Sequence, residues 1–343
     1  MTDRAPTAFV TGGTGFVGSH LVEALLDRGY GEVRCLVRSE PKWLAGLRVK
    51  RVRGTLDDPG LLADALRGVD YVYHVAGLTR APALPPLMEA NVAGTLSVMH
   101  AVEAMENPPK RVLVTSTLAV IGEADTPVAD ESTPMNPVSL YGISKARMEH
   151  ALRQDGWMER LPLVIVRPPA VYGPRDNDIL DFFKSVDRGL CPVIGSGTHP
   201  TVSLVHVRDL VRGMILAAES PGAQGETFFV GSEAFYSWHE VRDAALKALG
   251  RRALTIHVPG FMVPAIGAAS EIAGRAMRKY PALNRDKANE ILNAVKMCSV
   301  EKAMGQLGYR QEIDLESGVA ETIAWYREAG LLSRRRPLEE SFH

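Results

Sequence analysis

The chain has 343 residues, 46% of them hydrophobic, and its formal net charge is −1 at pH 7. This length fits one α/β domain with an added lobe, or two domains, and it allows a sizeable core. The balanced charge, with no basic stripe, excludes nucleic acid as an expected partner. The three cysteines stand alone, without CxxC spacing or a His/Cys cluster. We therefore expect no metal site, no disulfides and a reducing, cytoplasmic location, and no signal peptide before the first strand.

Short β-branched runs alternate with helical patterns through the first half of the chain. Strands are expected at residues 7–11, 32–38, 49–54, 69–76, 111–117 and 162–168, with a returning strand within 221–231. Helices are expected at 16–29, 61–68, 90–105, 140–153 and 238–250. This alternation predicts a doubly wound parallel sheet with helices on both faces, which binds ligands beyond the carboxyl ends of its strands.

The segment TGGTGFVG directly follows the first expected strand and opens the first helix. Gly12 permits a tight turn, Gly15 lets the backbone approach a pyrophosphate, and Gly18 lets the helix pack close to the strand. The free N–H groups at the helix start, around Phe16 and Val17, would bind phosphate oxygens. The motif predicts a dinucleotide-binding Rossmann domain.

The end of the second strand reads LVRSEPK, with Arg38 where NAD-binding chains usually carry an acid. A guanidinium suits a 2′-phosphate through charge-assisted bonds, and Lys42 could assist. We therefore expect NADP(H) to be preferred, with NAD(H) possible. In the alternative interpretation Arg38 only stacks on the adenine.

The pattern divides the chain into two lobes and a tail. We assign residues 1–173 and about 202–232 to the Rossmann domain, about 174–201 and 233–330 to a smaller, mostly helical substrate lobe, and 331–343 to a flexible tail. The apolar run 254–277 is interrupted by prolines and charges, so it is too broken for a membrane span. We interpret it as a buried helix with a loop. A lid over a lipophilic substrate and a surface membrane contact are the alternatives.

The segment YGISK places Tyr141 and Lys145 four residues apart, on one side of a helix. A free phenol has a pKa of about 10, which a nearby ammonium and a positively charged nicotinamide would lower. Tyr141 could then exchange a proton with a substrate oxygen. Hydroxyl groups of the segment 115–122, at the end of the fifth strand, could bind the same oxygen.

Seven motifs occur together in one order, and the chain over residues 7 to 330 resembles the extended short-chain dehydrogenase/reductase family. Within this family it resembles the branch of 3β-hydroxysteroid dehydrogenase-like and dihydroflavonol reductase-like enzymes. The motifs are TGGTGFVG, HVAG, NVAGT, TSTLAVIG, YGISK, RPPAVYGP and VHVRDL. The resemblance implies a Rossmann fold, a nicotinamide cofactor and a small-molecule substrate.

The resemblance also implies roles for single residues. Tyr141 is the acid/base, and Lys145 binds the nicotinamide ribose and lowers the tyrosine pKa. Thr117 is the catalytic hydroxyl, and its neighbour Ser116 is the substitute for that role and a substrate contact. Gly12, Gly15 and Gly18 hold the pyrophosphate.

Further positions follow from the same motifs. Ala76, Gly77 and Pro168 are expected along the cofactor channel, and Asn91 is expected to hold a loop near it. Among candidate substrate contacts, Tyr172 follows the sixth strand and His199 lies on the loop GSGTHP.

The reaction class is narrowed by two residues after Thr117. The family's 4,6-dehydratases carry Asp-Glu there, whereas this chain has Leu118 and Ala119, and it lacks the catalytic cysteine of the epimerase/reductases. We expect an NAD(P)-dependent oxidoreductase that interconverts a ketone and a secondary alcohol on a lipophilic or aromatic molecule. An NAD-dependent sugar-nucleotide 4-epimerase is the alternative. A catalytically silent dinucleotide-binding regulator is the third class, but such proteins typically lose the tyrosine or the lysine.

A homodimer is expected from the family, which often pairs through the tyrosine-bearing helix and its neighbour. Val102, Met105, Met148 and Leu152 would suit such an interface, and packing against the sheet explains them equally well.

Overall fold

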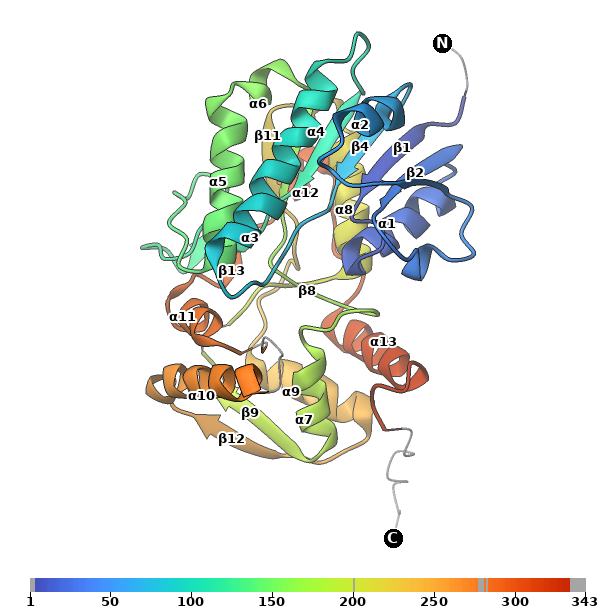
Figure 1. The fold of residues 1–343 in the computed structure, drawn as a ribbon. Helices are drawn as coiled ribbons and strands as arrows, with labels where there is room; N and C mark the ends of the chain where they lie inside the picture. The colour runs from blue at the N-terminus through green and yellow to red at the C-terminus, as the bar shows by residue number, and fades with distance from the viewer. Residues whose placement is uncertain (1–3, 200, 277–280, 282, 334–343) are drawn as a thin grey trace.

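The computed structural model describes residues 4–199, 201–276, 281 and 283–333. Its centre is a seven-stranded sheet with the order β11-β7-β5-β4-β1-β2-β3, in which every neighbouring pair is parallel (Figure 1). The strands are β1 (Thr7–Thr11), β2 (Glu32–Val37), β3 (Lys50–Arg53), β4 (Tyr71–His74), β5 (Arg111–Thr115), β7 (Leu163–Arg167) and β11 (Glu226–Phe229). The expected Rossmann sheet is confirmed, including the strand that returns late in the chain.

Helices cover both faces of this sheet because successive side chains of each buried strand point to opposite sides. On β1, Val10 packs in the core beneath α1 (Phe16–Asp27), α8 (Val207–Glu219) and α12 (Glu301–Leu307). Phe9 packs in the other core, beneath α2 (Pro59–Leu66), α4 (Gly94–Glu103), α5 (Leu140–Gln154) and α6 (Trp157–Arg160). Val102, Met148 and Leu152 lie fully buried in this second core, so packing within the chain explains them. A homodimer stays a prediction.

The helix expected at 90–105 begins earlier than the sequence indicates. It starts as α3 (Leu84–Met88) and passes through a π-helical turn, η2 (Glu89–Ala93), into α4. Pro85 and Pro86 are tolerated because they stand in the first turn, where backbone N–H groups have no partner within the helix. The π turn buries the side chain of Asn91.

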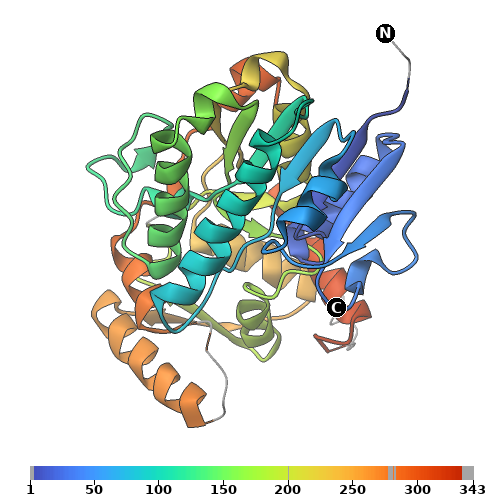
Figure 2. The ribbon, with the colours of Figure 1, turned by 45° about the horizontal axis from the view of Figure 1, so that its top comes forward.

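A smaller, mostly helical lobe lies at the end of the molecule opposite the sheet (Figures 1 and 2). It contains α7 (Leu180–Asp187), β9 (Leu190–Ile194), α9 (Trp238–Leu249), β12 (Leu254–Val258), α10 (Val263–Ala276), α11 (Arg285–Asn293) and α13 (Leu315–Glu328). Short strand pairs link the two parts, β8 (Ala170–Tyr172) with β10 (Leu204–His206) and β6 (Val128–Ala129) with β13 (Met297–Cys298). The remaining short helices are η1 (Lys42–Leu44), η3 (Leu118–Val120), η4 (Pro221–Ala223) and η5 (Gly260–Met262).

One part of the expected substrate lobe packs with the sheet instead. Ala303 and Leu307 of α12, and Tyr309 after it, belong to the core beneath α8. The Tyr309 hydroxyl donates a 2.8 Å hydrogen bond to the carbonyl oxygen of Gly231, at the end of the returning strand segment. The range 233–330 is therefore not a continuous lobe.

The interpretation of the run 254–277 as a buried helix with a loop is wrong. It forms the edge strand β12, the short turn η5 and the helix α10. Leu254, Phe261 and Ile272 are among the most exposed large apolar side chains that the structure describes. Apolar residues do recur at helical spacing in α10, but no residue that the structure describes packs against the outward face of this helix. Within the described residues no helix combines the length and the apolar character that crossing a bilayer requires.

Candidate active site

The glycine turn after β1 leaves no room for side chains. Gly12 has φ +75°, and a Cβ on it would lie 2.6 Å from the Ala76 nitrogen. A Cβ on Gly18 would overlap the carbonyl oxygen of Gly12, which already accepts a 2.9 Å hydrogen bond from Gly15 N–H. Ala76 N–H in turn donates to the Thr11 hydroxyl, at 3.2 Å. The turn thus ties the end of β1 to the end of β4.

The N-terminus of α1 fits a pyrophosphate. Gly15 is the N-cap, and in the described structure no side chain caps the helix and no acid stands in its first turn. The first N–H groups of the helix, including those of Phe16 and Val17, are therefore available to donate hydrogen bonds to an anion. The glycine turn formed by Gly12, Gly15 and Gly18 has the shape that a bound dinucleotide requires.

Two arginines stand at the adjoining ends of β2 and β3. Arg38 is exposed directly after β2, as expected. The strand register places Val37, the last residue of β2, beside Arg53, the last residue of β3, which is also exposed. Arg53 is a candidate cofactor contact that the sequence analysis missed, because only the register shows that the two strand ends coincide.

The Thr117 side chain lies near that of Tyr141, at the start of α5. Burial raises the pKa of Tyr141 above its ordinary value, and the nearby Thr117 hydroxyl opposes this shift. The negative charges of Glu290 and Asp178 raise the same pKa further. Loss of hydration of the phenolate dominates this shift, and the lowering expected from Lys145 with a bound nicotinamide stays a prediction.

Lys145 lies buried one helical turn after Tyr141. Its ammonium has a single described partner, the Met148 sulfur at 3.4 Å, and burial lowers its pKa to about 8 although the charge of Glu149 opposes this. A Cβ on Gly77 would lie 4.0 Å from this Nζ and 2.9 Å from the Asn91 side-chain oxygen. Glycine there keeps open the space beside the ammonium.

Ser116 and Thr117 turn to different partners although they are neighbours. The Ser116 hydroxyl donates a 2.6 Å hydrogen bond to the Glu149 carboxylate. Glu149 is fully buried and accepts two further bonds from Arg167, at 2.8 and 2.7 Å. Of the two candidates, Thr117 is therefore the one whose hydroxyl lies near Tyr141. Pro168 lies beside them, because its carbonyl accepts a 2.8 Å bond from Leu118 N–H.

Buried polar bonds fix the loop that follows β4. Asn91 accepts from Leu78 N–H at 2.7 Å and donates to the Leu78 carbonyl and to the Ser144 hydroxyl, each at 2.9 Å. The expected loop-holding role of Asn91 agrees with these bonds. His74 links Thr11, at 2.8 Å, to Thr95, at 2.9 Å. Burial lowers the pKa of His74 to about 3, so the ring stays neutral at neutral pH.

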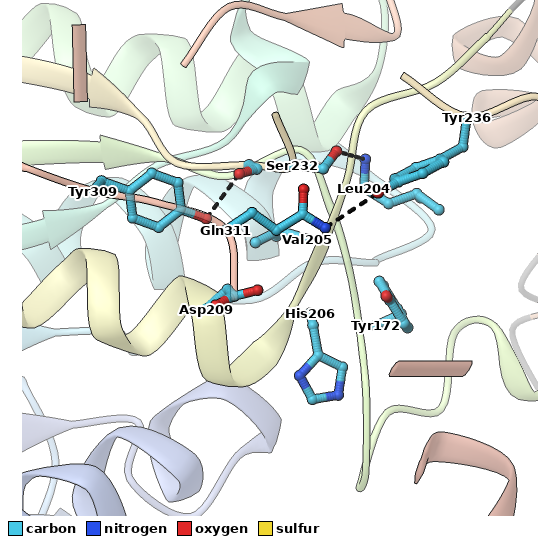
Figure 3. A pocket seen from close by; sticks show the side chains of 10 residues that line it. Tyr172, Leu204, Val205, His206, Asp209, Ser232, Tyr236, Tyr309 and Gln311 are labelled. Carbon is cyan, nitrogen blue, oxygen red and sulfur yellow. Dashed lines mark hydrogen bonds between the residues drawn. The ribbon is translucent and has the colours of Figure 1, made fainter. Parts of the chain in front are cut away.

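Tyr172 is packed between the two parts of the chain (Figure 3). Its ring packs against that of His206, with centroids 5.3 Å apart, and a Cβ on Gly318 of α13 would lie 2.5 Å from its hydroxyl. Tyr172 and the nine residues that line this site with it leave no room for even a water molecule. Among the described residues no hydrogen bond joins Tyr172 to Tyr141 or Lys145.

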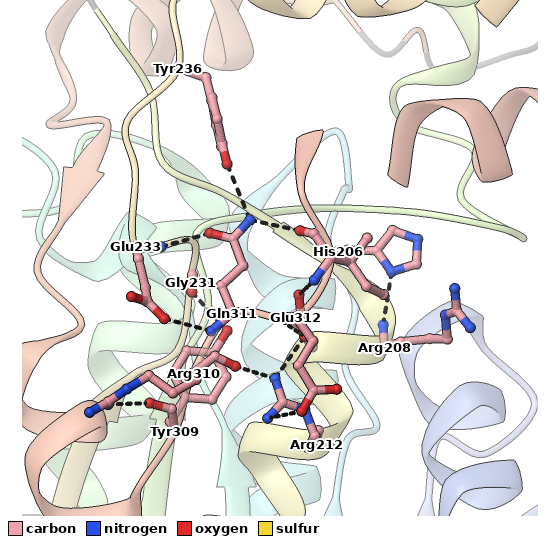
Figure 4. Close-up of polar contacts among 12 residues, drawn as sticks. His206, Arg208, Arg212, Gly231, Glu233, Tyr236, Tyr309, Arg310, Gln311 and Glu312 are labelled. Carbon is pink, nitrogen blue, oxygen red and sulfur yellow. Dashed lines mark hydrogen bonds and ion pairs between the residues drawn. The ribbon is translucent and has the colours of Figure 1, made fainter. Parts of the chain in front are cut away.

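A network beside Tyr172 fixes the segment that leads to α13. The Gln311 amide donates a 3.1 Å hydrogen bond to the Tyr236 hydroxyl (Figure 4). The Asp209 carboxylate accepts hydrogen bonds from the N–H groups of Glu312 and Ile313. This arrangement favours a structural role for the Tyr172 region. His199 lies exposed on its loop, where its N–H donates to Ser196, so the structure does not bring it together with Tyr141.

Acidic residues that the sequence analysis did not single out lie near Tyr141. Asp178 forms an ion pair with Arg80, at 2.6 Å, and Glu290 lies on α11. Asp286 of α11 accepts a 2.9 Å bond from Leu140 N–H, which fixes α11 over the start of α5. These residues lie far apart in the chain, so only the tertiary fold could reveal their proximity.

Residues 8–231 match the model of the NAD dependent epimerase/dehydratase family. A ceramide reductase of Caulobacter vibrioides is 29% identical over 97% of this chain and 98% of its own length. A relative from Stigmatella aurantiaca, "4-hydroxy-2-methyl-3-oxo-4-farnesyl-3,4-dihydroquinoline-1-oxide ketoreductase", is 30% identical over 91% of this chain and 94% of its own.

Among solved structures, MoeE5 in complex with UDP-glucuronic acid and NAD superimposes with a TM-score of 0.72. It is 25% identical, and the match covers 94% of this chain and 99% of that one. The family match over residues 8–231 includes the glycine turn and the Tyr141 helix. This protein is an enzyme of the NAD-dependent epimerase/dehydratase family, an extended short-chain dehydrogenase/reductase.

Proposed function

We propose that this enzyme transfers hydride between NADP(H) and a lipophilic or aromatic molecule, interconverting a ketone and a secondary alcohol. The observation that carries the proposal is the proximity of Thr117 to Tyr141, with Lys145 one turn further along the same helix. Leu118 and Ala119 follow Thr117, and neither side chain can move the proton that elimination of water requires. The pair therefore fits simple hydride transfer.

Residues of the chain itself would supply the proton that the substrate oxygen receives. Bound NADP(H) would supply the hydride, with its ribose beside Lys145 and its pyrophosphate at the glycine turn. In the reductive direction the Tyr141 hydroxyl donates its proton to the carbonyl oxygen, and the Thr117 hydroxyl orients that oxygen. Burial raises the pKa of Tyr141, so the phenol is protonated at neutral pH. The phenol can therefore act as the proton donor in this step.

Arg38 and Arg53 support the choice of NADP(H). Both are exposed at adjoining strand ends, where the 2′-phosphate of the cofactor would lie. Two guanidinium groups can share a phosphate through bidentate bonds, whereas a free ribose hydroxyl gives them no charged partner.

Asp178 and Glu290 lie close enough to Tyr141 to raise its pKa, and each is paired with a basic residue, Asp178 with Arg80 and Glu290 with Lys287. An NAD-dependent sugar-nucleotide 4-epimerase remains the second candidate, supported by the likeness to MoeE5, which was solved with a UDP-sugar and NAD.

We also propose that the enzyme acts in the cytoplasm, because all three of its cysteines are unpaired and buried. The expected homodimer remains part of this proposal.

The two candidate functions predict different cofactor content. Purified protein is denatured, any released dinucleotide is identified by mass spectrometry, and the emptied protein is titrated with NADPH and NADH. The reductase predicts a weakly held or missing cofactor and tighter binding of NADPH. Tightly retained NAD would favour the epimerase, which does not need to exchange its cofactor.

A further inference from the structure

The two-stranded sheet of the substrate lobe has an apolar outer face. Its strands are parallel and in register, so that Leu190 lies beside Leu254 and Pro192 beside Ile256. Cys191 is buried in the lobe, and since side chains alternate along a strand, its neighbours point outward. Leu254 is 69% exposed. An outward sheet face normally carries polar side chains.

The exposed apolar residues continue into the turn and helix that follow. Phe261 is 83% exposed, and Met262 beside it is also exposed. Between residues 263 and 274, the part of α10 whose side chains the structure describes, the exposed positions are all apolar: Pro264, Ala265, Ile266, Ala269, Ile272 and Ala273. Figure 2 shows α10 at the edge of the lobe, turned away from the rest of the protein.

A helix that faces water carries polar residues on that side, and soluble monomers rarely expose a large continuous apolar surface. We call this region the β12–α10 surface. It is defined by Leu190, Leu254, Ile256, Phe261, Ile266 and Ile272.

Two arginines stand at the sheet end of the β12–α10 surface. Arg188 precedes β9 and Arg252 precedes β12, and both are exposed. The strand starts adjoin, because Leu254 N–H donates a 2.9 Å bond to the carbonyl oxygen of Gly189. Neither guanidinium forms an ion pair or a hydrogen bond with any residue in the described part of the chain. The surface therefore combines an apolar area with cationic groups that have no carboxylate partner there.

Contacts join this surface to the catalytic helix. The two helices α10 and α11 pack closely, since a Cβ on Gly267 would lie 2.8 Å from the carbonyl oxygen of Asn284. At the other end, α11 holds the residue before Tyr141 through the bond from Leu140 N–H to Asp286. The Asn289 side-chain amide of α11 donates a 2.8 Å hydrogen bond to the carbonyl oxygen of Val138.

We propose that the β12–α10 surface binds the surface of an anionic phospholipid bilayer, from which the enzyme takes its lipophilic substrate. The inference rests on the proposed function for the identity of the substrate. Phe261 and its apolar neighbours enter the boundary between headgroups and acyl chains, and Arg188 and Arg252 pair with lipid phosphates. A bilayer that contains anionic lipids offers both the apolar and the anionic partner.

The test is cosedimentation of the full chain with vesicles, without substrate or cofactor. One set contains phosphatidylcholine alone, and the other contains phosphatidylcholine and phosphatidylglycerol. The protein is expected to bind the phosphatidylglycerol vesicles more tightly, and added salt is expected to weaken this binding. Phe261→Ser is expected to lower the affinity about tenfold, because a buried phenyl group is lost. Arg188→Glu with Arg252→Glu is expected to remove the preference for phosphatidylglycerol.

Phe235→Ser is the matched control, since Phe235 is 39% exposed outside this surface, and it is expected to bind vesicles like the parent. Circular dichroism verifies the fold of each variant. Lack of vesicle binding by the parent protein, or equal losses in both phenylalanine variants, would overturn the proposal. A dimer in light scattering that Phe261→Ser dissociates, without vesicle binding, would overturn it in favour of a second copy. Because no turnover is measured, failure here is distinguishable from failure of the proposed reaction, which is assayed separately with a water-soluble ketone.

Discussion

The Ser116 hydroxyl donates a 2.6 Å hydrogen bond to the Glu149 carboxylate, whereas its neighbour Thr117 lies near Tyr141. The two adjacent hydroxyls are therefore separated into a buried structural role and a role at the reacting oxygen. Thr117→Ala is expected to lower kcat about 10²-fold, the usual loss for one donor to a reacting oxygen. Ser116→Ala is expected to lower kcat only a few-fold. Steady-state kinetics with a reducible ketone measures both, and equal losses would contradict the separation.

Tyr141→Phe removes the proton donor and keeps the ring. We expect kcat to fall about 10²- to 10⁴-fold, with NADPH affinity unchanged by fluorescence titration. Tyr172→Phe is the matched control, because the Tyr172 hydroxyl faces Gly318 in the core. It is expected to keep nearly full kcat, and a large loss would place Tyr172 in the catalytic machinery.

Burial lowers the pKa of Lys145 to about 8. Its ammonium is therefore charged below that pH and loses its proton as the pH rises through it. We expect NADPH binding to weaken above pH about 8, since a neutral amine binds ribose hydroxyls less strongly than an ammonium. Lys145→Met should bind weakly at every pH. A parent profile that stays flat to pH 10 (about two units above this pKa) would contradict the assignment.

Glu149 and Arg167 form a fully buried ion pair. Arg167→Met leaves the carboxylate without its main partner and is expected to cost about 3–5 kcal/mol in the free energy of unfolding. Arg153→Met removes a half-exposed partner of the same carboxylate and is expected to cost less than about 1 kcal/mol. Urea unfolding distinguishes the two, and similar losses would contradict the structure.

The same pair gives stability a defined pH dependence. Hydrogen bonds and the charge of Arg167 hold the pKa of Glu149 below its ordinary value, against the effect of burial. A carboxyl whose pKa is lower in the folded state stabilises the fold above the unfolded-state pKa, about 4.3, and this contribution is lost as the pH falls through the folded-state pKa. Acid unfolding of Glu149→Gln should therefore depend less on pH than that of the parent.

Arg38→Asp is expected to reverse the cofactor preference, with NADPH affinity reduced at least about tenfold relative to NADH. Arg53→Ala should weaken NADPH binding in the same direction but less. Arg67→Ala is the control, because Arg67 pairs with Asp64 on an exposed helix face. Unchanged affinity ratios in Arg38→Asp would support adenine stacking instead.

Local patterns were sufficient to predict much of the sheet and the catalytic helix. Gly12 needs a positive φ and Tyr141 stands four residues before Lys145, and both facts depend only on nearby sequence. The adjoining ends of β2 and β3, which bring in Arg53, depend on strand register. Asp178 and Glu290 depend on how distant segments fold over Tyr141.

The sequence could not show which apolar residues find a partner. The run 254–277 has the composition of a buried segment. Apolar periodicity predicts which face of a helix is apolar, but it does not predict whether another part of the protein packs against that face. The family resemblance implied Thr117 as the catalytic hydroxyl and Ser116 as its substitute, but only the position of Glu149 shows which hydroxyl turns inward.

The most direct test follows NADPH absorbance while emptied enzyme is mixed with a panel of lipophilic ketones, for the parent protein and for Tyr141→Phe. The account predicts net NADPH oxidation with alcohol formed in equal amount, and loss of this reaction in the variant. It would be contradicted if no ketone were reduced while protein retaining NAD inverted C4 of a sugar nucleotide without net change in the cofactor.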